Sequence, residues 1–341
     1  MIVCEPSRRR RPLHGALLGA SGVLAVALGA VVASCGDRAP KPASERAWPE
    51  LSHEERDARM FDAVGVEPRR VRIGSSLVRF IDVGPRRSEA DAGPDGASDG
   101  GVWLFVHGFG GSMGDFAPLV IRVSESRRVL AIDLPGFGDS ATTEEDTSIE
   151  FLADLVEAFA RAVDAPQADL VCHSLGGQVC LALGIRGARF VRTLTLIDAA
   201  GVYERSSFVE HVSKTFAHIN IGEVVTAPGR SALDLPEGDR AVFRRLVSDD
   251  RATLTALESF RTDYRGEVQR IAVPTQIVWG ADDQMFSLES AFFLKENIKG
   301  ARLYLVEGAG HTPQLSHPEV VLRWLERPPG AEDRGGADGG I

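Results

Sequence analysis

The stretch VCHSLGGQVC, residues 171–180, places Ser174 between an apolar run that is typical of a strand and a glycine-containing run that is typical of a helix start. A serine on such a turn points its hydroxyl outward, close to the unpaired N–H groups of the helix N-terminus. The turn is strained and needs small neighbours, which Gly176 and Gly177 provide, whereas Cys172 stands where the pattern G-x-S-x-G has glycine. The chemistry that this arrangement predicts is nucleophilic attack by the serine oxygen.

A nucleophilic serine needs a base, because its free hydroxyl is a weak nucleophile. Among the eight histidines, His311 is the best-placed candidate. It lies in GAGHTPQLSHPE, after the last predicted strand, where Gly308 and Gly310 make a loop that can lift an imidazole to the sheet edge. His107 and His173 lie inside or beside strand ends, and we expect His107 to hydrogen-bond a loop rather than react.

The carboxylate that orients such a base should follow another strand. TQIVWGADDQMF offers Asp282 and Asp283 just past one strand, and LTLIDAAG offers Asp198 past a different one. The order Ser174, Asp283, His311 along the chain is one known order of a serine, acid and histidine triad. Asp198 remains the rival for the acid.

The strands that must position these residues are predicted from nearly continuous runs of apolar residues. Such runs are typical of strands that helices cover on both faces. The strand-like runs are 78–84, 102–108, 128–134, 169–174, 191–198, 275–280 and 302–308. Helical stretches between most of them predict an α/β fold with a mainly parallel central sheet flanked by helices. The alternation breaks between about 202 and 268, where the chain is expected to be helical. In such sheets ligands bind beyond the carboxyl ends of the strands.

From about Val71 to Glu326 the chain resembles the α/β-hydrolase-fold family. The resemblance is carried, in order and at normal spacing, by the blocks FVHGFGGS, AIDLPGFGDS, CHSLGG, WGADDQMF and GAGHTPQLSHPE. In the family's W-G-x-x-D block the catalytic acid is the last residue, which implies Asp283 here and leaves Asp282 as an ordinary loop acid. Some relatives place the acid after the earlier strand, at the position of Asp198.

The same resemblance implies an oxyanion hole made by two backbone N–H groups. One belongs to Leu175 at the helix N-terminus, and the other to Phe109 in the loop after VHG. It further implies a helical cap, residues 202–268, inserted after the sixth strand of the α/β-hydrolase fold. Met113 and Phe116 are expected either to line an acyl pocket or to belong to the core.

Serine at 174 argues against epoxide hydrolases and haloalkane dehalogenases, which carry aspartate at the equivalent position. Overall resemblance is closest to capped lipases and esterases of the monoacylglycerol-lipase type. The resemblance therefore implies a serine hydrolase that cleaves carboxylic (acyl) esters of small molecules or lipids through an acyl-enzyme intermediate. A carbon–carbon bond hydrolase with the same triad, and a non-catalytic ligand-binding protein of this fold, remain alternatives.

The first 34 residues are predicted to be a signal peptide, because a run of four arginines is followed by an apolar, uncharged stretch. VASC at the end of that stretch resembles a bacterial lipobox, in which cleavage leaves a lipid-modified N-terminal cysteine, here Cys35. Gly36 rather than aspartate after this cysteine favours the outer membrane. A retained membrane anchor over 13–34 and a plain secretory signal are the alternatives. We therefore expect an extracytoplasmic, membrane-anchored lipoprotein.

Composition limits the remaining possibilities. The net charge of −10 disfavours a nucleic-acid partner. No C-x-x-C, H-E-x-x-H or G-x-G-x-x-G pattern occurs, so neither a metal nor a cofactor is expected. We predict a flexible tether at 35–50, a hydrolase core at 51–201 and 269–327, and a disordered tail at 328–341.

Two cysteines flank the serine, and we expect them to be small buried hydrophobes rather than a disulfide. If Cys172 ends a strand and Cys180 lies two turns into a helix, the rise of about 1.5 Å per helical residue should carry their Cα atoms beyond bridging range.

Overall fold

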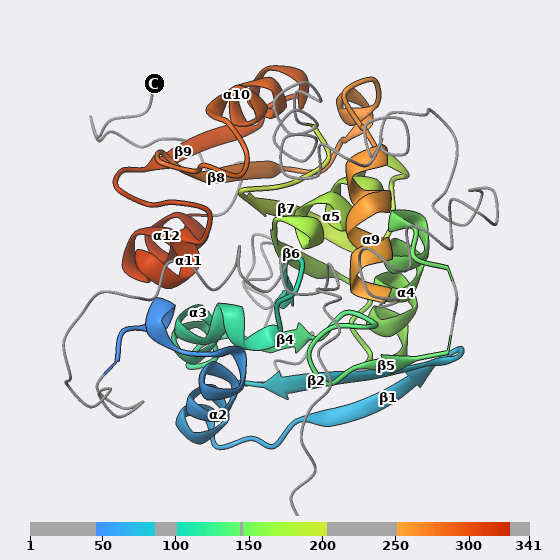
Figure 1. The fold of residues 1–341 in the computed structure, drawn as a ribbon, viewed down its shortest axis with the longest axis vertical. Helices are drawn as coiled ribbons and strands as arrows, with labels where there is room; N and C mark the ends of the chain where they lie inside the picture. The colour runs from blue at the N-terminus through green and yellow to red at the C-terminus, as the bar shows by residue number, and fades with distance from the viewer. Residues whose placement is uncertain (1–45, 86–100, 144–145, 203–250, 328–341) are drawn as a thin grey trace, which may run out of the picture. The chain divides into compact units, whose positions relative to one another are not determined.

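The computed structural model describes residues 46–85, 101–143, 146–202 and 251–327 (Figure 1). Within these ranges, nine strands form one sheet at the centre of the fold. The strands are β1 (Arg69–Ile73), β2 (Ser76–Val83), β3 (Val102–Val106), β4 (Val129–Ile132), β5 (Ala141–Thr142), β6 (Ala168–His173), β7 (Val191–Ile197), β8 (Thr275–Gly280) and β9 (Arg302–Val306).

The strand order is β1-β2-β4-β3-β6-β7-β8-β9, with the short β5 paired to β2. Strands β4, β3, β6, β7, β8 and β9 pair in parallel, and only the pairs that involve β2 are antiparallel among the described strands. The carboxyl ends of the parallel strands therefore meet at one edge of the sheet, where the loops that follow β3, β6, β7, β8 and β9 converge.

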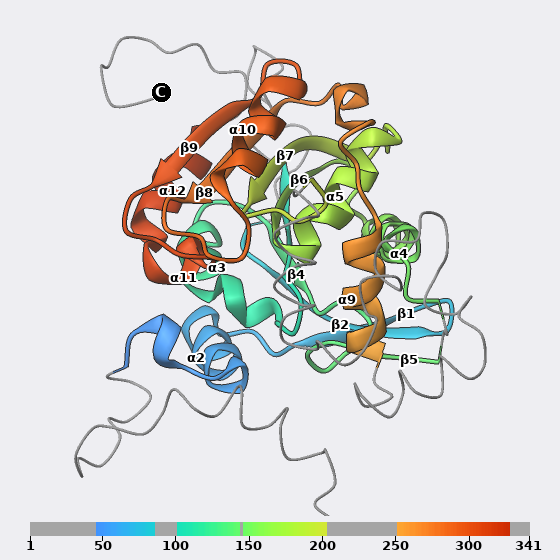
Figure 2. The ribbon, with the colours of Figure 1, turned by 45° about the horizontal axis from the view of Figure 1, so that its top comes forward.

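Helices cover both faces of the sheet, as Figures 1 and 2 show: α2, α3 and α12 lie on one face, and α4 and α5 on the other. Side chains alternate between the two faces along each strand. In β3, for example, Leu104 packs in the cluster under α4 and α5, whereas Phe105 packs in the cluster under α2, α3 and α12. The described helices are η2 (Trp48–Glu50), α2 (His53–Val64), η4 (Met113–Phe116), α3 (Ala117–Val123), α4 (Ile149–Ala162), α5 (Leu175–Ile185), α9 (Arg251–Arg261), η6 (Val268–Arg270), α10 (Leu288–Asn297), α11 (Pro313–Ser316) and α12 (Pro318–Leu325).

The fold class predicted from the sequence is confirmed. All seven predicted strands are present, with ends that differ by a few residues. The prediction missed β1, whose sequence RRVRI is rich in arginine because it is an edge strand with exposed side chains, and the two-residue β5. The region predicted as a helical cap, residues 202–268, follows β7, which is the sixth strand when β5 is not counted.

Several sequence predictions fall partly or wholly outside the described residues. These are the signal peptide and lipid site, the tail at 328–341, and most of the cap, of which α9 is the described helix. The predicted tether ends too late, because residues 46–50 contact the body of the protein: the guanidinium of Arg59 lies 4.2 Å from the centre of the Trp48 ring. Among the described helices, none is long and apolar enough to cross a membrane.

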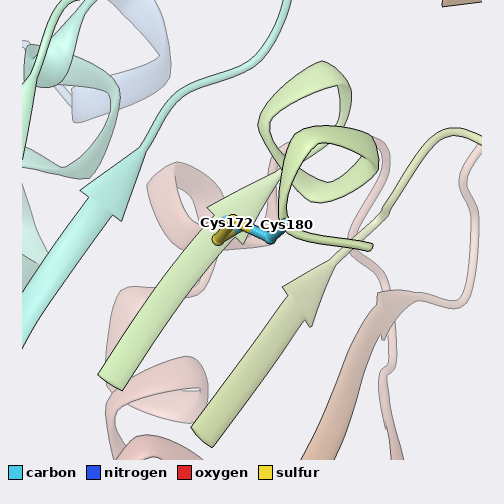
Figure 3. Close-up of a disulfide and its surroundings, with 2 residues drawn as sticks. All are labelled: Cys172 and Cys180. Carbon is cyan, nitrogen blue, oxygen red and sulfur yellow. A yellow bond between two sulfur atoms is a disulfide. The ribbon is translucent and has the colours of Figure 1, made fainter. Parts of the chain in front are cut away.

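The prediction that the two cysteines stay unbridged is wrong. Cys172 at the end of β6 and Cys180 in α5 form a disulfide, with their Cα atoms 6.5 Å apart (Figure 3). The rise along the helix would carry Cys180 away from Cys172 only if the helix continued in the direction of the strand. Here the tight turn at Ser174 reverses the chain, so that α5 runs back beside β6 and the second turn of the helix lies next to the strand.

Candidate active site

The turn between β6 and α5 carries Ser174 in a conformation that side-chain-bearing residues rarely adopt, with φ 52° and ψ −117°. Such strain persists only where surrounding structure holds it. The helix behind the turn lies directly on the sheet: a Cβ on Gly176 would come within 2.2 Å of the Val106 carbonyl oxygen. Glycine at this position therefore permits the close approach of α5 to β3 that aims the serine outward.

Three side chains from three different loops meet above this turn. His311 Nε2 lies 3.0 Å from Ser174 Oγ, and His311 Nδ1 lies 2.8 Å from Asp283 Oδ2. Because an ionised carboxylate can only accept, the ring donates its Nδ1 hydrogen to Asp283. Nε2 is then free to accept the serine proton. The arrangement provides a nucleophile, a base and an orienting acid in one hydrogen-bonded chain.

The carboxylate of Asp283 is held on both of its oxygens. Oδ1 accepts the backbone N–H groups of Met285 at 2.7 Å and Phe286 at 3.2 Å, and the side chain is fully shielded from solvent. Burial by itself would raise the pKa of Asp283, but the hydrogen bond from His311, its charge and the two N–H groups lower it overall. The acid is therefore ionised at neutral pH and fixed in direction.

The other two candidate acids lie in different surroundings. Asp282 is exposed, and its backbone N–H donates to the Ala309 carbonyl oxygen at 2.9 Å. Asp198 is fully buried at the end of β7 and accepts the Gly280 N–H at 2.9 Å. It is Asp283, not Asp198, that forms the hydrogen bond to His311.

A second histidine supports the first, in a role that no sequence motif predicted. His173 Nε2 donates to the backbone carbonyl oxygen of His311 at 2.7 Å, and the two ring centres lie 4.9 Å apart. Burial, followed by the charge of His311, lowers the pKa of His173 to about 3, so its ring is neutral. His107 behaves as predicted: its Nε2 accepts the Leu134 N–H, and its Nδ1 donates to the Gly108 carbonyl oxygen.

The two predicted oxyanion donors lie at the same place. Leu175 is the first residue of α5, so its N–H has no acceptor within the helix. Phe109 and Leu175 both line the pocket that contains Ser174. The loop before Phe109 approaches the serine closely, since a Cβ on Gly108 would come within 2.9 Å of the Ser174 Cβ. Their role as donors to an oxyanion stays a prediction.

The pocket over Ser174 has a volume of about 510 Å³ and mostly apolar walls. The apolar side chains on its walls come from several elements: Phe109, Leu175, Ala200, Phe260, Met285, Phe286 and Leu315. Phe260 belongs to α9, the described helix of the predicted cap. Met113 and Phe116 are fully buried in the core instead.

One wall of this pocket comes from the N-terminal helix α2, which the sequence analysis did not connect with the site. Pro49, His53 and Arg56 line it together with Asp115. Asp115 accepts from Arg56 at 2.7 Å and lies 3.0 Å from His53 Nδ1. The helix itself carried a readable signal, the capping box S-x-x-E at 52–55, which the structure forms. No sequence signal indicated that this helix contacts the pocket.

Asp198, Asp283 and His311 also form the one group among the described residues whose ligand atoms lie close enough together to hold a metal ion, within 4.8 Å of one another. The hydrogen bonds from His311 and from the backbone already give these atoms partners, apart from one oxygen of Asp198. We therefore interpret the group as a hydrogen-bonded network, and the expectation of no metal stays a prediction.

Known proteins resemble this chain in sequence and in fold. The profile of the alpha/beta hydrolase family matches residues 103–324. A pimeloyl-[acyl-carrier protein] methyl ester esterase of Neisseria meningitidis is 32% identical over 256 residues, which cover 69% of this chain and 94% of that enzyme.

Solved structures show the shared fold. A protein of Acinetobacter baumannii that is assigned as a lipase superposes with a TM-score of 0.60 at 19% identity, over 82% of this chain and 95% of its own. A meta-cleavage product hydrolase of Pseudomonas fluorescens superposes with a TM-score of 0.55 at 19% identity, over 76% and 96%. At these identities the likeness concerns the fold alone.

Proposed function

Because this chain belongs to the alpha/beta hydrolase family, we propose that it is a serine hydrolase that cleaves carboxylic esters through an acyl-enzyme at Ser174. The observation that carries the proposal is the continuous chain Ser174–His311–Asp283, with contacts of 3.0 and 2.8 Å. The esterase named among its relatives supports an ester as the bond that is broken.

In the first half of the reaction, Ser174 Oγ attacks the acyl carbon and His311 Nε2 takes its proton. The imidazolium that forms is stabilised by the Asp283 carboxylate on its other side. The N–H groups of Phe109 and Leu175 bind the oxyanion, and one such donor is worth about 2.7–4 kcal/mol of barrier in a known case. His311 then gives its proton to the leaving alkoxide, which departs as the alcohol.

In the second half, a water molecule attacks the acyl-enzyme while His311 again acts as the base. The bond between the acyl carbon and Ser174 Oγ breaks, and the imidazolium returns the proton to the serine. The pocket supplies the surroundings for both halves, because the apolar side chains around Ser174 strengthen each electrostatic interaction near them.

The substrates that fit this pocket best are acyl esters, among them esters of lipids. Apolar walls of this kind bind acyl chains through the burial of apolar surface, about 25 cal/mol for each Å² removed from water. A protein anchored through Cys35 would meet such substrates at a membrane.

The disulfide between Cys172 and Cys180 supports an extracytoplasmic location, because disulfides persist in oxidising compartments and are rare in the cytosol. Together with the lipobox-like VASC, it favours a lipoprotein that faces the periplasm or the exterior. Replacing Cys35 with alanine in the full-length protein should abolish palmitate labelling and release the protein from membranes. Retained labelling would refute the lipid anchor.

Turnover of p-nitrophenyl acyl esters by the full-length protein tests the reaction. Ser174→Ala should lose activity and labelling by a fluorophosphonate probe, while keeping its far-UV circular dichroism. Unchanged turnover in this variant would remove the proposal. Failure of the wild-type protein to react with the probe would favour a ligand-binding role, and preferential cleavage of vinylogous diketones would favour a carbon–carbon bond hydrolase.

A further inference from the structure

Asp198 is a buried carboxyl group that the proposed mechanism does not use. It follows β7 with a left-handed backbone, φ 43°, and its side chain has no solvent exposure. One oxygen, Oδ1, accepts the Gly280 N–H at 2.9 Å. The other, Oδ2, is equally buried and has no hydrogen-bond partner among the described residues. A buried polar atom without a partner costs about 1–3 kcal/mol unless a proton or a neighbour satisfies it.

The nearest functional neighbours of Asp198 are Asp283 and His311. Each of the three offers an atom within 4.8 Å of the others. Within the described part of the chain, His311 is the one cationic partner of Asp283, and no ion pair reaches Asp198. Two ionised carboxylates cannot share such a buried place at low cost, because neither has a permanent positive charge to offset the repulsion.

We propose that Asp198 is a protonated carboxylic acid that donates its O–H to the Asp283 carboxylate and so positions that carboxylate against His311. The inference rests on the proposed function of the Ser174 site. Burial, and then the negative charge of Asp283, raise the pKa of Asp198 well above its usual range, in agreement with a neutral side chain. Asp198 is a positioning residue, because it acts through Asp283 and does not contact the reacting atoms.

A neutral Asp198 supports the action of His311 as a base in two ways. It supplies a further donor to the Asp283 carboxylate, which adds to the two backbone N–H groups that hold Oδ1. It also keeps the pair at a single negative charge. A second carboxylate this close would favour the imidazolium and leave His311 protonated when it must accept the serine proton.

Other titratable groups around Asp198 and Asp283 do not change the single negative charge of this pair. His173 lies beside His311 and is neutral, with its pKa lowered to about 3 by burial. Gly280 offers only its backbone N–H to Asp198, and the ends of β7 and β8 present no other charged side chain to it among the described contacts.

Steady-state kinetics of the full-length protein on a p-nitrophenyl ester test the positioning role. Asp198→Ala removes the donor, and kcat should fall about tenfold to a hundredfold with KM within about twofold, because a hydrogen bond to a charged group is lost. Asp198→Asn should recover most of the rate, since its amide can accept from Gly280 and donate to Asp283 in the same places. An Asp198→Ala enzyme as fast as wild type would overturn the proposal.

The pH dependence separates a neutral Asp198 from an ionised one. Asp198→Asn should leave the acid limb of kcat/KM unchanged, because a neutral amide replaces a neutral acid. If Asp198 were ionised, the same variant would remove a negative charge beside His311 and move that limb about one to three pH units lower. Such a shift contradicts the proposal even if Asp198→Ala fails to fold.

A readout that needs no turnover keeps this test apart from the test of function. In Ser174→Ala protein, ¹⁵N NMR gives the pKa of the His311 ring with and without Asp198→Asn. Equal values support a neutral Asp198, and a fall of about one unit or more contradicts it. If wild-type protein cleaves no ester and binds no fluorophosphonate, the proposed function fails, and the NMR comparison still decides the state of Asp198.

Discussion

Two pairs of buried aspartates lie in this molecule, and they differ in the cation that accompanies them. In one pair, Asp57 and Asp133 both accept from Arg79 Nη1, at 2.7 and 3.1 Å. In the other, the imidazole of His311 is the one titratable cation beside Asp198 and Asp283 within the part of the chain that the structure describes. A guanidinium stays charged at any pH that a folded protein meets, whereas an imidazole gains and loses its proton near neutrality.

The first pair has the features of a structural ion cluster. Burial would lower the pKa of Arg79, but Asp133 and Asp57 raise it overall. Asp57 also accepts from Ser112 Oγ, and Asp133 accepts the Met113 N–H. These contacts tie α2, β2 and the loop before η4 together. Buried acids beside a permanent cation form a structural ion cluster here, whereas those beside an imidazole can take part in proton transfer.

The largest contrast should come from replacing one acid in each pair by its amide. Asp283→Asn should lower kcat on a p-nitrophenyl ester by about 10³- to 10⁴-fold, because the imidazole loses its orienting carboxylate. The matched Asp57→Asn should keep kcat within about threefold and lower the free energy of unfolding by about 1–3 kcal/mol, the cost of weakening a buried charged hydrogen bond. Equal activities of the two variants would contradict the division of roles.

Replacing Arg79 should show how much its guanidinium contributes to the stability of the first pair. Arg79→Met leaves two buried carboxyl groups without their guanidinium, and the free energy of unfolding at pH 7 should fall by about 3–5 kcal/mol in urea titrations. The pKa of Asp57 is already raised, by burial and by Asp133, so its protonation should make the loss smaller as the pH falls. A loss that does not depend on pH would argue against two uncompensated acids.

A third contrast concerns the disulfide, which joins the strand and the helix on either side of Ser174. Cys172 and Cys180 are separated by eight positions, and a loop of this size corresponds to about 2.5 kcal/mol of stability in the chain-entropy treatment. The double variant Cys172→Ala with Cys180→Ala should lose about this much in urea unfolding. Peptide mapping after alkylation of unreduced protein provides the control. Free thiols at both positions in the oxidised protein would be the contrary result.

Another expected contrast is a slope in the pH dependence of stability. The folded-state pKa of Asp198 is raised, so the folded protein holds a proton there that the unfolded chain releases above about pH 4. The stability that this proton contributes is therefore full below that pH and is lost as the pH rises toward the folded-state pKa. Wild type should lose about 1.4 kcal/mol per pH unit relative to Asp198→Asn over this range. Parallel curves for the two proteins would indicate an ionised Asp198.

Residue types and their spacing were enough to predict the local parts of this molecule. The apolar runs identified seven of the nine strands, and the fold class followed from their alternation with helices. Ser174, Asp283 and His311 were named from short motifs at strand ends, and the structure brings those three together. Motifs of this kind are readable because they encode a local backbone shape, such as the strained turn at Ser174, that few other sequences allow.

Contacts between distant groups became visible with the folded chain. The fold joined Cys172 to Cys180 by reversing the chain, brought His173 to the carbonyl oxygen of His311, and placed helix α2 on the wall of the pocket. It also brought the two rival acids together, with Asp283 bonded to His311 and Asp198 within 4.8 Å of both. These contacts depend on strand order and on how each loop closes over the sheet edge, and residue types near one position in the chain carry no record of either.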